Sequence, residues 1–230
     1  MPVEYRYGNI FDFNGNLAHG TNASGKMNKG IAVEFKDKFP VMFSEYENLC
    51  KAGRHQAGMV YAYNHIDVTA TNLHEQIMKL SGLPVTEKTD AIVSVKMEFW
   101  ITRRTIYNLC IKPHWKMKSE DYIVASALRQ MVKMAEEEVN KPVPSFSEGF
   151  HPTISDPLVI AMPAIGCGLG GLKWDTQVKQ IIEEVGSKTP CTLVVYLQEE
   201  CKEKNVSTQN IDPHDADPTR GLQKNLERKT

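Results

Sequence analysis

Strand-like and helix-like patterns of hydrophobic residues alternate along this chain. Short apolar runs typical of strands occur at residues 3–11, 16–23, 58–66, 103–112, 157–166 and 191–197. Apolar residues recur at helical spacing in segments 30–53, where Pro40 interrupts the pattern, 119–140, where Ser119 is the expected N-cap, and 174–186. Helices that alternate with nearly continuous apolar strands predict a three-layer α/β/α sandwich around a mixed central sheet.

Three stretches depart from this pattern. Residues 67–102 show little clear periodicity, and the Pro- and Ser-rich residues 141–156 are typical of a loop. After about residue 199 the chain is polar. We therefore expect one domain over residues 1–199, with an insertion at about 67–102, and a flexible tail over 200–230. The insertion and the tail are the expected places for a protein partner to dock.

Composition narrows the classes of function. The 230 residues are 41% hydrophobic, and Lys+Arg 27 against Asp+Glu 28 gives a net charge of -1. This balance argues against a large duplex-binding surface but allows a local basic patch. The five cysteines include no C-x-x-C pair, and we find no leader and no membrane-spanning run. We expect a soluble cytoplasmic protein, with no metal and no cofactor.

The glycine-rich stretch 159–175 is the first candidate site. Gly166, Gly168 and Gly171 have the spacing G-x-G-x-x-G between an apolar strand and a helix. A dinucleotide-binding dehydrogenase would need further strand–helix units, whereas a single strand follows here. Two readings remain open for the isolated loop: a tight strand-to-helix turn, or a backbone site for an anion.

A second turn of the same kind lies near the N-terminus. Asn22, Ser24 and Gly25 follow an apolar strand, and Lys29 and Gly30 precede an amphipathic helix. Two helix N-termini approached by small residues can hold the two phosphates of one diphosphate. The two turns together predict a site for a nucleoside diphosphate.

Four stretches in this order carry a family resemblance: "GNIF", "TNASGKMNKGIAVEFKDKFP", "IKPHWKMKS" and "MPAIGCGLGGLKW". They resemble a macrodomain, and within that family the branch of terminal ADP-ribose glycohydrolases and antitoxin partners of DNA ADP-ribosylating toxins. The likeness covers most of residues 3–198. It also extends to macrodomains that dephosphorylate ADP-ribose 1''-phosphate.

The resemblance implies a set of ADP-ribose-binding residues. Asn9 stands where the family usually has an Asp for the adenine amine, and an amide oxygen can still accept a hydrogen bond there. Asn22 matches the residue that faces the distal ribose. The implied binding set is Asn9, Ile10, Asn22, Ser24, Lys29, Gly30, Ile31, Ala32, Ile165, Gly166, Cys167, Gly168, Leu169 and Gly170.

The resemblance also implies catalytic residues. Lys112 matches a lysine linked in this branch to removal of ADP-ribose from protein carboxylates or DNA bases, either by nucleophilic attack or by charge stabilisation. His19 and His114 are candidate proton carriers. The protein-directed glycohydrolase has an Asp where this chain has Gly170, so a paired acid is missing at that position.

We therefore expect an ADP-ribose-binding hydrolase that releases ADP-ribose from a modified protein or DNA. Two alternatives stay open. One is a phosphatase of ADP-ribose 1''-phosphate, and the other is a module that binds ADP-ribose without turnover.

Overall fold

The structure is a computed structural model that describes residues 3–72, 97–141 and 150–197. The chain divides into two units, Met1–Tyr196 and Leu197–Thr230. The fold given below is that of the first unit. The predicted tail at 200–230, and most of the predicted insertion, lie outside the described residues.

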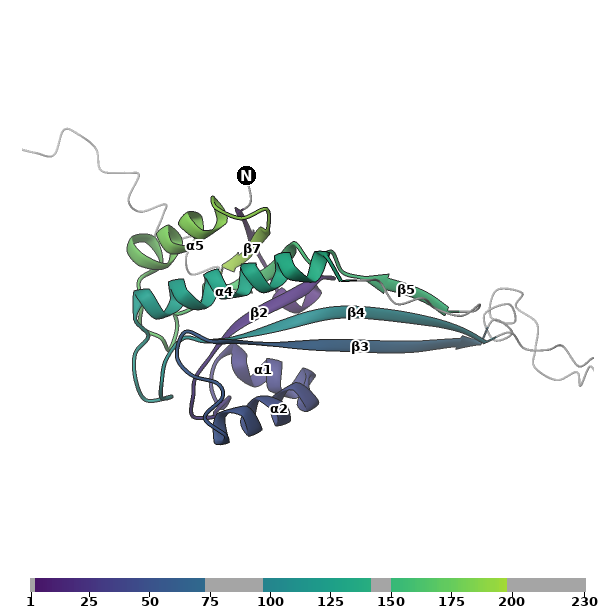
Figure 1. Cartoon of the computed structure of the whole chain (residues 1–230), viewed down its shortest axis with the longest axis horizontal. Coiled ribbons are helices and arrows are strands. Elements are labelled where there is room, and N and C mark those ends of the chain that lie inside the picture. Colours follow the sequence, from purple (N-terminus) through teal and green to yellow (C-terminus); the bar gives the residue numbers. More distant parts are fainter. Residues whose placement is uncertain (1–2, 73–96, 142–149, 198–230) are drawn as a thin grey trace, which may run out of the picture. The chain divides into compact units, whose positions relative to one another are not determined.

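Seven strands form one sheet, shown in Figure 1. The order is β1-β7-β6-β2-β4-β3, with β5 also paired to β4. Pairings β2–β4, β2–β6, β6–β7 and β4–β5 are parallel, and β3–β4 is antiparallel. The strands are β1 (Val3–Tyr7), β2 (Asn16–Thr21), β3 (Val60–Asn72), β4 (Met97–Cys110), β5 (Phe150–Ile154), β6 (Val159–Pro163) and β7 (Thr192–Leu197).

Helices cover both faces of the sheet. Helices α1 (Ile31–Lys38) and α2 (Pro40–Lys51) lie on one face, and α4 (Asp121–Val139) and α5 (Lys179–Gly186) lie on the other (Figure 1). Pro40 begins α2, where its missing N–H costs no helical hydrogen bond. Short helical turns η1 (Ile10–Asp12) and η2 (Trp174–Val178) precede β2 and α5. The predicted three-layer sandwich is confirmed.

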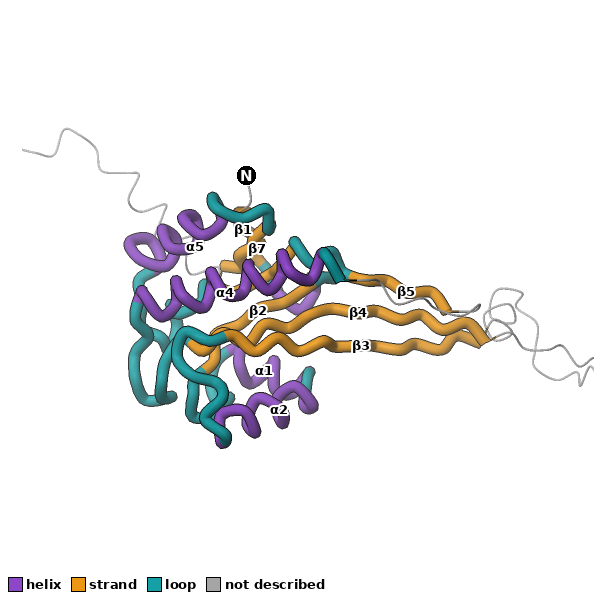
Figure 2. The backbone as a smooth tube through the Cα atoms, viewed as in Figure 1, coloured by secondary structure: helices purple, strands orange, loops and turns teal. Residues whose placement is uncertain are grey.

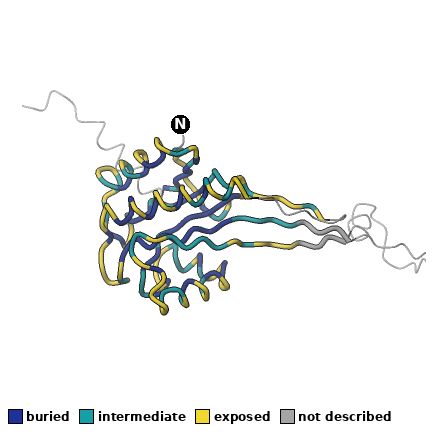
Figure 3. The backbone as a smooth tube through the Cα atoms, viewed as in Figure 1, coloured by how far each residue is buried: buried dark blue, intermediate teal, exposed yellow. Residues whose placement is uncertain are grey.

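Side chains of β2 and β4 alternate between the two helical layers. The register pairs Leu17 with Ile106 and His19 with Asn108, and these side chains face α1, where Phe35 is fully buried. His19 stacks on Phe35 with ring centroids 3.9 Å apart. Figure 3 shows that burial concentrates in the middle of the sheet. Within the described part of the chain, no helix combines the length and apolarity that crossing a bilayer requires.

Three details differ from the sequence prediction. The strands predicted at 58–66 and 103–112 are longer, as β3 and β4, and together with β5 they extend away from the helices (Figure 2). The segment 141–156, predicted as a loop, contains β5, whose backbone pairs with β4 although Pro152 interrupts its pattern. The N-cap of α4 is Glu120, and no side chain caps that helix, so the prediction of Ser119 as N-cap was wrong.

Candidate functional site

Three loops meet at the carboxyl end of the parallel strands. We call them the β2–α1 loop (residues 22–30), the β4–α4 loop (111–120) and the β6–α5 loop (164–173). They gather at the end of the sheet opposite the extended part of β3 and β4 (Figure 2). Parallel strands place their carboxyl ends at one edge, so loops distant in sequence come together where open α/β sheets bind ligands.

Asn22 organises the β2–α1 loop. Its Oδ1 accepts hydrogen bonds from the Ser24 backbone N–H at 3.1 Å, the Ser24 hydroxyl at 2.7 Å and the Lys26 N–H at 3.3 Å. Its Nδ2 donates to the Lys26 carbonyl at 2.6 Å, and the Tyr46 hydroxyl donates to the Asn22 carbonyl at 2.7 Å. Because its side chain is buried in these contacts, Asn22 fixes the shape of the loop.

The β2–α1 loop ends at an open helix N-terminus. Gly30 is the N-cap of α1 with φ 61°, a left-handed conformation that favours glycine, and no side chain caps the helix. Ile31 and Ala32 form the first turn, and Lys29 is exposed beside it. The first N–H groups of the helix therefore carry the positive end of its dipole into the loop cluster.

The β6–α5 loop has little room for side chains. A Cβ added to Gly170 would lie 2.3 Å from the Gly166 carbonyl oxygen, whereas one added to Gly168 would meet nothing within 4 Å. Gly166 has φ 93° and accepts a hydrogen bond from the Leu172 N–H at 3.0 Å. Since any side chain at position 170 collides with the loop backbone, an Asp at that position would require a different loop conformation.

Lys112 joins the three loops. Its carbonyl accepts from the Ala23 N–H at 3.1 Å, and its Nζ donates to the Leu169 carbonyl at 3.1 Å. The residue is 8% exposed, and this burial lowers the pKa of its ammonium. A partly desolvated lysine is thus held between the β2–α1 and β6–α5 loops.

Ser119 and His114 complete the β4–α4 loop. The Ser119 N–H donates to the Gly170 carbonyl at 2.8 Å, and its buried hydroxyl has no hydrogen-bond partner among the described residues. His114 is half-buried, and its Nδ1 accepts from the Lys116 N–H at 3.3 Å. His114 therefore lies two residues from Lys112 in the same loop, as the sequence predicts.

His19 does not belong to the loop surface. It is 0% exposed, its Nε2 is 2.8 Å from the Asn108 Oδ1, and burial lowers its pKa to about 4. A ring enclosed between Phe35 and the sheet cannot exchange a proton with a bound ligand. The prediction of His19 as a proton carrier is therefore wrong.

The other predicted residues divide between surface and interior. Cys167 is half-buried and Gly168 and Leu169 are exposed, so this part of the loop faces outward. The side chains of Ile10 and Ile165 are buried, which leaves their backbones as the groups that can reach a ligand. Asn9 is exposed, and its Oδ1 accepts from the Phe11 N–H at 3.0 Å as the N-cap of η1.

No acidic or metal-binding cluster accompanies the loops in the part of the chain that is described. Asp12, Glu34 and Asp175 are all exposed, and so is Glu120, the last residue of the β4–α4 loop. No group of three or more His, Cys, Asp or Glu residues among the described ones is placed to hold a metal ion. Lys112 is therefore the buried ionisable group of this loop cluster.

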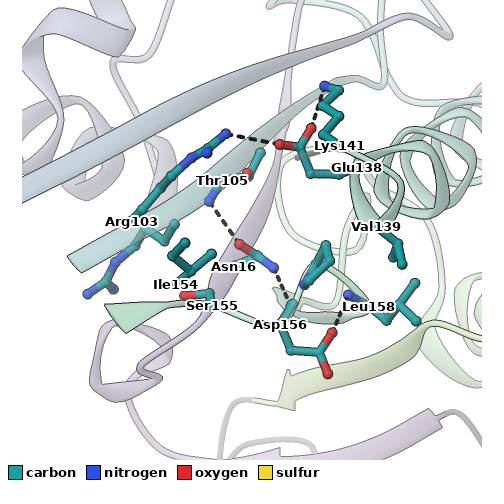
Figure 4. Close-up of a pocket in the computed structure, with 12 residues that line it drawn as sticks. Asn16, Arg103, Thr105, Glu138, Val139, Lys141, Ile154, Ser155, Asp156 and Leu158 are labelled. Carbon is teal, nitrogen blue, oxygen red and sulfur yellow. Dashed lines mark hydrogen bonds and ion pairs between the residues drawn. The ribbon is translucent and has the colours of Figure 1, made fainter. Parts of the chain in front are cut away.

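A pocket of about 220 Å³ lies elsewhere, at the amino end of β2 (Figure 4). It forms beside β4, at the point where the pairing partner of β4 changes from β2 to β5. Glu138 binds Arg103 at 3.0 Å and also binds Lys141. Asn16 accepts from the Thr105 N–H at 2.8 Å and donates to the Asp156 carbonyl at 2.7 Å. These polar groups bind one another, although the Nε of Arg104, which also lines the pocket, is buried without a partner among the described residues.

Two site features were not predicted from sequence. One is the hydrogen bond from the Ser119 N–H to the Gly170 carbonyl. It was not predicted because a serine just before a helix is normally interpreted as an N-cap. The other is the Leu169 carbonyl as the partner of Lys112, because backbone acceptors leave no signal in side-chain identity.

Comparison with known proteins gives consistent matches. The family model described as "Macro domain" matches residues 71–181. A DNA ADP-ribosyl transferase–DNA ADP-ribosyl glycohydrolase fusion protein of Thermosipho africanus is 29% identical over 159 residues, covering 69% of this chain and 32% of that protein. A DNA ADP-ribosyl glycohydrolase of Thermus aquaticus is 26% identical over 169 residues, covering 73% and 33%. The chain thus spans about a third of the length of these relatives.

Solved structures share the fold. The macrodomain of Mycobacterium tuberculosis DarG has a TM-score of 0.57 at 21% identity, covering 84% of this chain and 96% of that one. Thermosipho africanus DarTG, solved in complex with ADP-ribose, has a TM-score of 0.57 at 24% identity, covering 86% and 42%. At these identities the structural likeness concerns the fold.

Proposed function

This chain belongs to the macrodomain family, and on that premise we propose that it binds ADP-ribose and hydrolyses the bond joining the distal ribose to a modified macromolecule. The observation that carries the proposal is Lys112, a desolvated lysine held between two open backbone loops. The relatives named DNA ADP-ribosyl glycohydrolase favour a DNA base as the group that is released.

We place the diphosphate of ADP-ribose between two loops. On one side the N-terminus of α1 presents the backbone of Gly30, Ile31 and Ala32 with no side-chain cap. On the other, the Gly166–Gly170 segment contains three glycines, with the exposed Leu169 side chain close to Gly30. A helix N-terminus and glycine-rich backbone together bind phosphate without a cationic clamp.

Lys112 supports two forms of the same reaction. In the neutral form, Nζ attacks the anomeric carbon while the bond to the base breaks and its electron pair leaves with the base. Water then releases ADP-ribose and regenerates the amine. In the charged form, the ammonium stabilises negative charge on the departing base while water attacks. A lowered pKa favours the first form, and the rate should then rise with pH up to that pKa.

Two groups position the reaction. Asn22 shapes the loop that holds the Lys112 carbonyl, so it acts through that loop. His114, in the β4–α4 loop, is the remaining histidine candidate for protonating the leaving base. The buried His19 offers no support for phosphate-ester chemistry at the distal ribose, so the phosphatase remains an outcome of the test.

The test compares three substrates: ADP-ribosylated single-stranded DNA, protein ADP-ribosylated on carboxylates, and ADP-ribose 1''-phosphate. Each is incubated with the wild type and with Lys112→Ala, and released ADP-ribose and phosphate are followed by mass spectrometry. We expect ADP-ribose release from DNA, abolished in the variant.

Release of phosphate that does not depend on Lys112 would contradict the proposal in favour of a phosphatase. Binding of ADP-ribose with no turnover of any substrate would leave a non-catalytic reader. Release from protein alone would retain the hydrolase and reject DNA as its target.

A further inference from the structure

The loop cluster carries a charge very different from that of the whole chain. Residues 22–33, 112–119 and 164–173 contain no Asp or Glu, although the chain as a whole has a net charge of -1. The same segments contain Lys26, Lys29, Lys112, Lys116, Lys118 and Lys173, of which all but Lys112 are exposed. The rim around the proposed ADP-ribose site is therefore locally cationic.

Four of these exposed lysines, Lys29, Lys116, Lys118 and Lys173, have no carboxylate partner among the described residues. Lys26 is different, because it lies near Glu47, whose pKa is lowered mainly by its hydrogen bond with Lys51 and in smaller part by the Lys26 charge. The cationic character is therefore strongest on the β4–α4 loop.

One of the two acidic residues that follow this rim is turned to another partner. Glu120 and Asp121 come directly after the β4–α4 loop segment that holds the lysines. Asp121 accepts hydrogen bonds from the Gln177 amide at 2.9 Å and 3.1 Å, near the start of α5. Its carboxylate is thus directed toward α5 rather than toward the lysines.

The β4–α4 loop also exposes an aromatic ring. Trp115 is 45% exposed, and the Lys116 Nζ lies 5.2 Å from the centre of its indole. Met117, two residues farther on, is 49% exposed. An exposed indole beside a cation is the arrangement that stacks an unpaired base while holding its phosphate.

The surrounding loops hold this surface in place. The backbone N–H of Trp115 donates to the Ser24 hydroxyl at 3.3 Å, and this bond joins Trp115 to the loop shaped by Asn22. The side-chain stem of Lys118 packs over Gly171, since a Cβ added there would meet its Cδ at 3.4 Å. The indole and the lysines are thus built onto the same framework as Lys112.

We propose that Trp115, Lys116 and Lys118 form a binding surface for a single nucleic-acid strand, which delivers the modified base to Lys112. The delivery of a modified base to Lys112 rests on the proposed function. Binding of the strand itself can be measured without any modified substrate. A duplex hides the faces of its bases, so the exposed indole favours a single strand.

The experiment measures fluorescence anisotropy of a short fluorescein-labelled, unmodified single-stranded DNA against the 230-residue protein. Trp115→Ala and the double variant Lys116→Gln/Lys118→Gln are compared with the wild type. The matched control is Lys133→Gln/Lys188→Gln, which removes two lysines whose side chains are 75% and 68% exposed on α4 and beyond α5. The duplex of the same sequence and poly-glutamate serve as competitors.

We expect Trp115→Ala to weaken strand binding about tenfold, as removal of one stacked base does. The Lys116→Gln/Lys118→Gln variant should weaken it by a similar factor and reduce its salt dependence, by about 0.7 in log–log slope for each phosphate that is no longer neutralised. The control variant should match the wild type, and neither competitor should displace the strand efficiently.

Three results would overturn the inference: no strand binding, an equal decrease in the control variant, or displacement by poly-glutamate as efficient as by single-stranded DNA. ADP-ribose affinity, measured by calorimetry, separates this inference from the proposed function. If Trp115→Ala weakens ADP-ribose binding as strongly as strand binding, the indole belongs to the ADP-ribose site and the strand surface is rejected. If strand binding fails while ADP-ribose is bound and released from DNA, the proposed function stands alone.

Discussion

The two ends of the parallel strands differ in how their polar groups are paired. At the amino end, Glu138 pairs with both Arg103 and Lys141. The side-chain amide of Asn16 both accepts a hydrogen bond through its oxygen and donates one through its nitrogen. At the carboxyl end, Ser119 has a buried hydroxyl without a described partner, and Lys112 has a backbone carbonyl as its acceptor. The pocket at the amino end pairs its charged groups with one another, although the buried Arg104 Nε has no partner among the described residues, whereas Lys112 has no carboxylate partner among those residues.

This difference separates a structural feature from a functional one. Buried polar groups are expected to be paired, so an end of the sheet where the charged side chains pair with one another stabilises the fold. An end that keeps a desolvated lysine, an uncapped helix and open glycine backbone carries stability costs that ligand binding can offset. Substitutions at the carboxyl end should therefore affect the ligand, and those at the amino end should affect stability.

The largest expected difference is between removing a lysine at the carboxyl end and removing one at the amino end. Lys112→Ala should lower the rate of ADP-ribose release by about 100-fold or more, because it removes the group proposed to act at the anomeric carbon. Lys141→Ala, which removes the ion pair with Glu138 at the amino end, should leave that rate unchanged. Single-turnover kinetics on ADP-ribosylated DNA measure both, and equal decreases would contradict the distinction.

His19 lies outside both ends, and its titration should change the free energy of unfolding by a similar amount. The folded pKa of His19 is about 4, against 6.5 for the free side chain, because burial disfavours its charged form. Its neutral form contributes stability fully above pH 6.5, and that contribution is lost as pH falls toward 4, by about 3 kcal/mol. Urea unfolding across this range checks it, and His19→Gln should remove this contribution while leaving that of His55, whose pKa burial also lowers to about 4. An unchanged curve in the variant would show that His19 does not titrate in this way.

Two glycines of the β6–α5 loop provide a matched pair. Gly170→Ala should weaken ADP-ribose binding about tenfold or more, since its Cβ would lie 2.3 Å from the Gly166 oxygen and force the loop to move. Gly168→Ala, with open space at that position, should change the affinity little. Calorimetry with ADP-ribose measures both variants, and equal affinities would show that the loop shape does not matter for binding.

The smallest effect on ligand binding is expected at the amino end. Asn16→Leu leaves the Thr105 N–H and the Asp156 carbonyl without their partner, so it should lower the free energy of unfolding by about 2 kcal/mol. ADP-ribose affinity of the folded variant should remain that of the wild type. A large decrease in affinity at unchanged stability would assign the pocket of Figure 4 to ligand binding.

Much of the fold was predictable because hydrophobic period and glycine spacing are local signals. The division at Pro40 and the helix at 121–139 follow from such patterns. The extension of β3 and β4 and the strand β5 were not predicted, because these backbones pair across long sequence separations without a strong apolar alternation. His19 was misassigned because its position before the ligand turn says nothing about which face of β2 it occupies. The register with Asn108, and hence its burial, is a property of the folded sheet.

A crystal structure of this chain with ADP-ribose would locate the binding site without any assumption about turnover. We expect the diphosphate between the backbone of Gly30–Ala32 and that of Gly166–Gly170, with the distal ribose next to the Lys112 Nζ. ADP-ribose bound instead in the pocket lined by Asn16, Arg103 and Glu138 would contradict the assignment of function to the carboxyl end of the sheet.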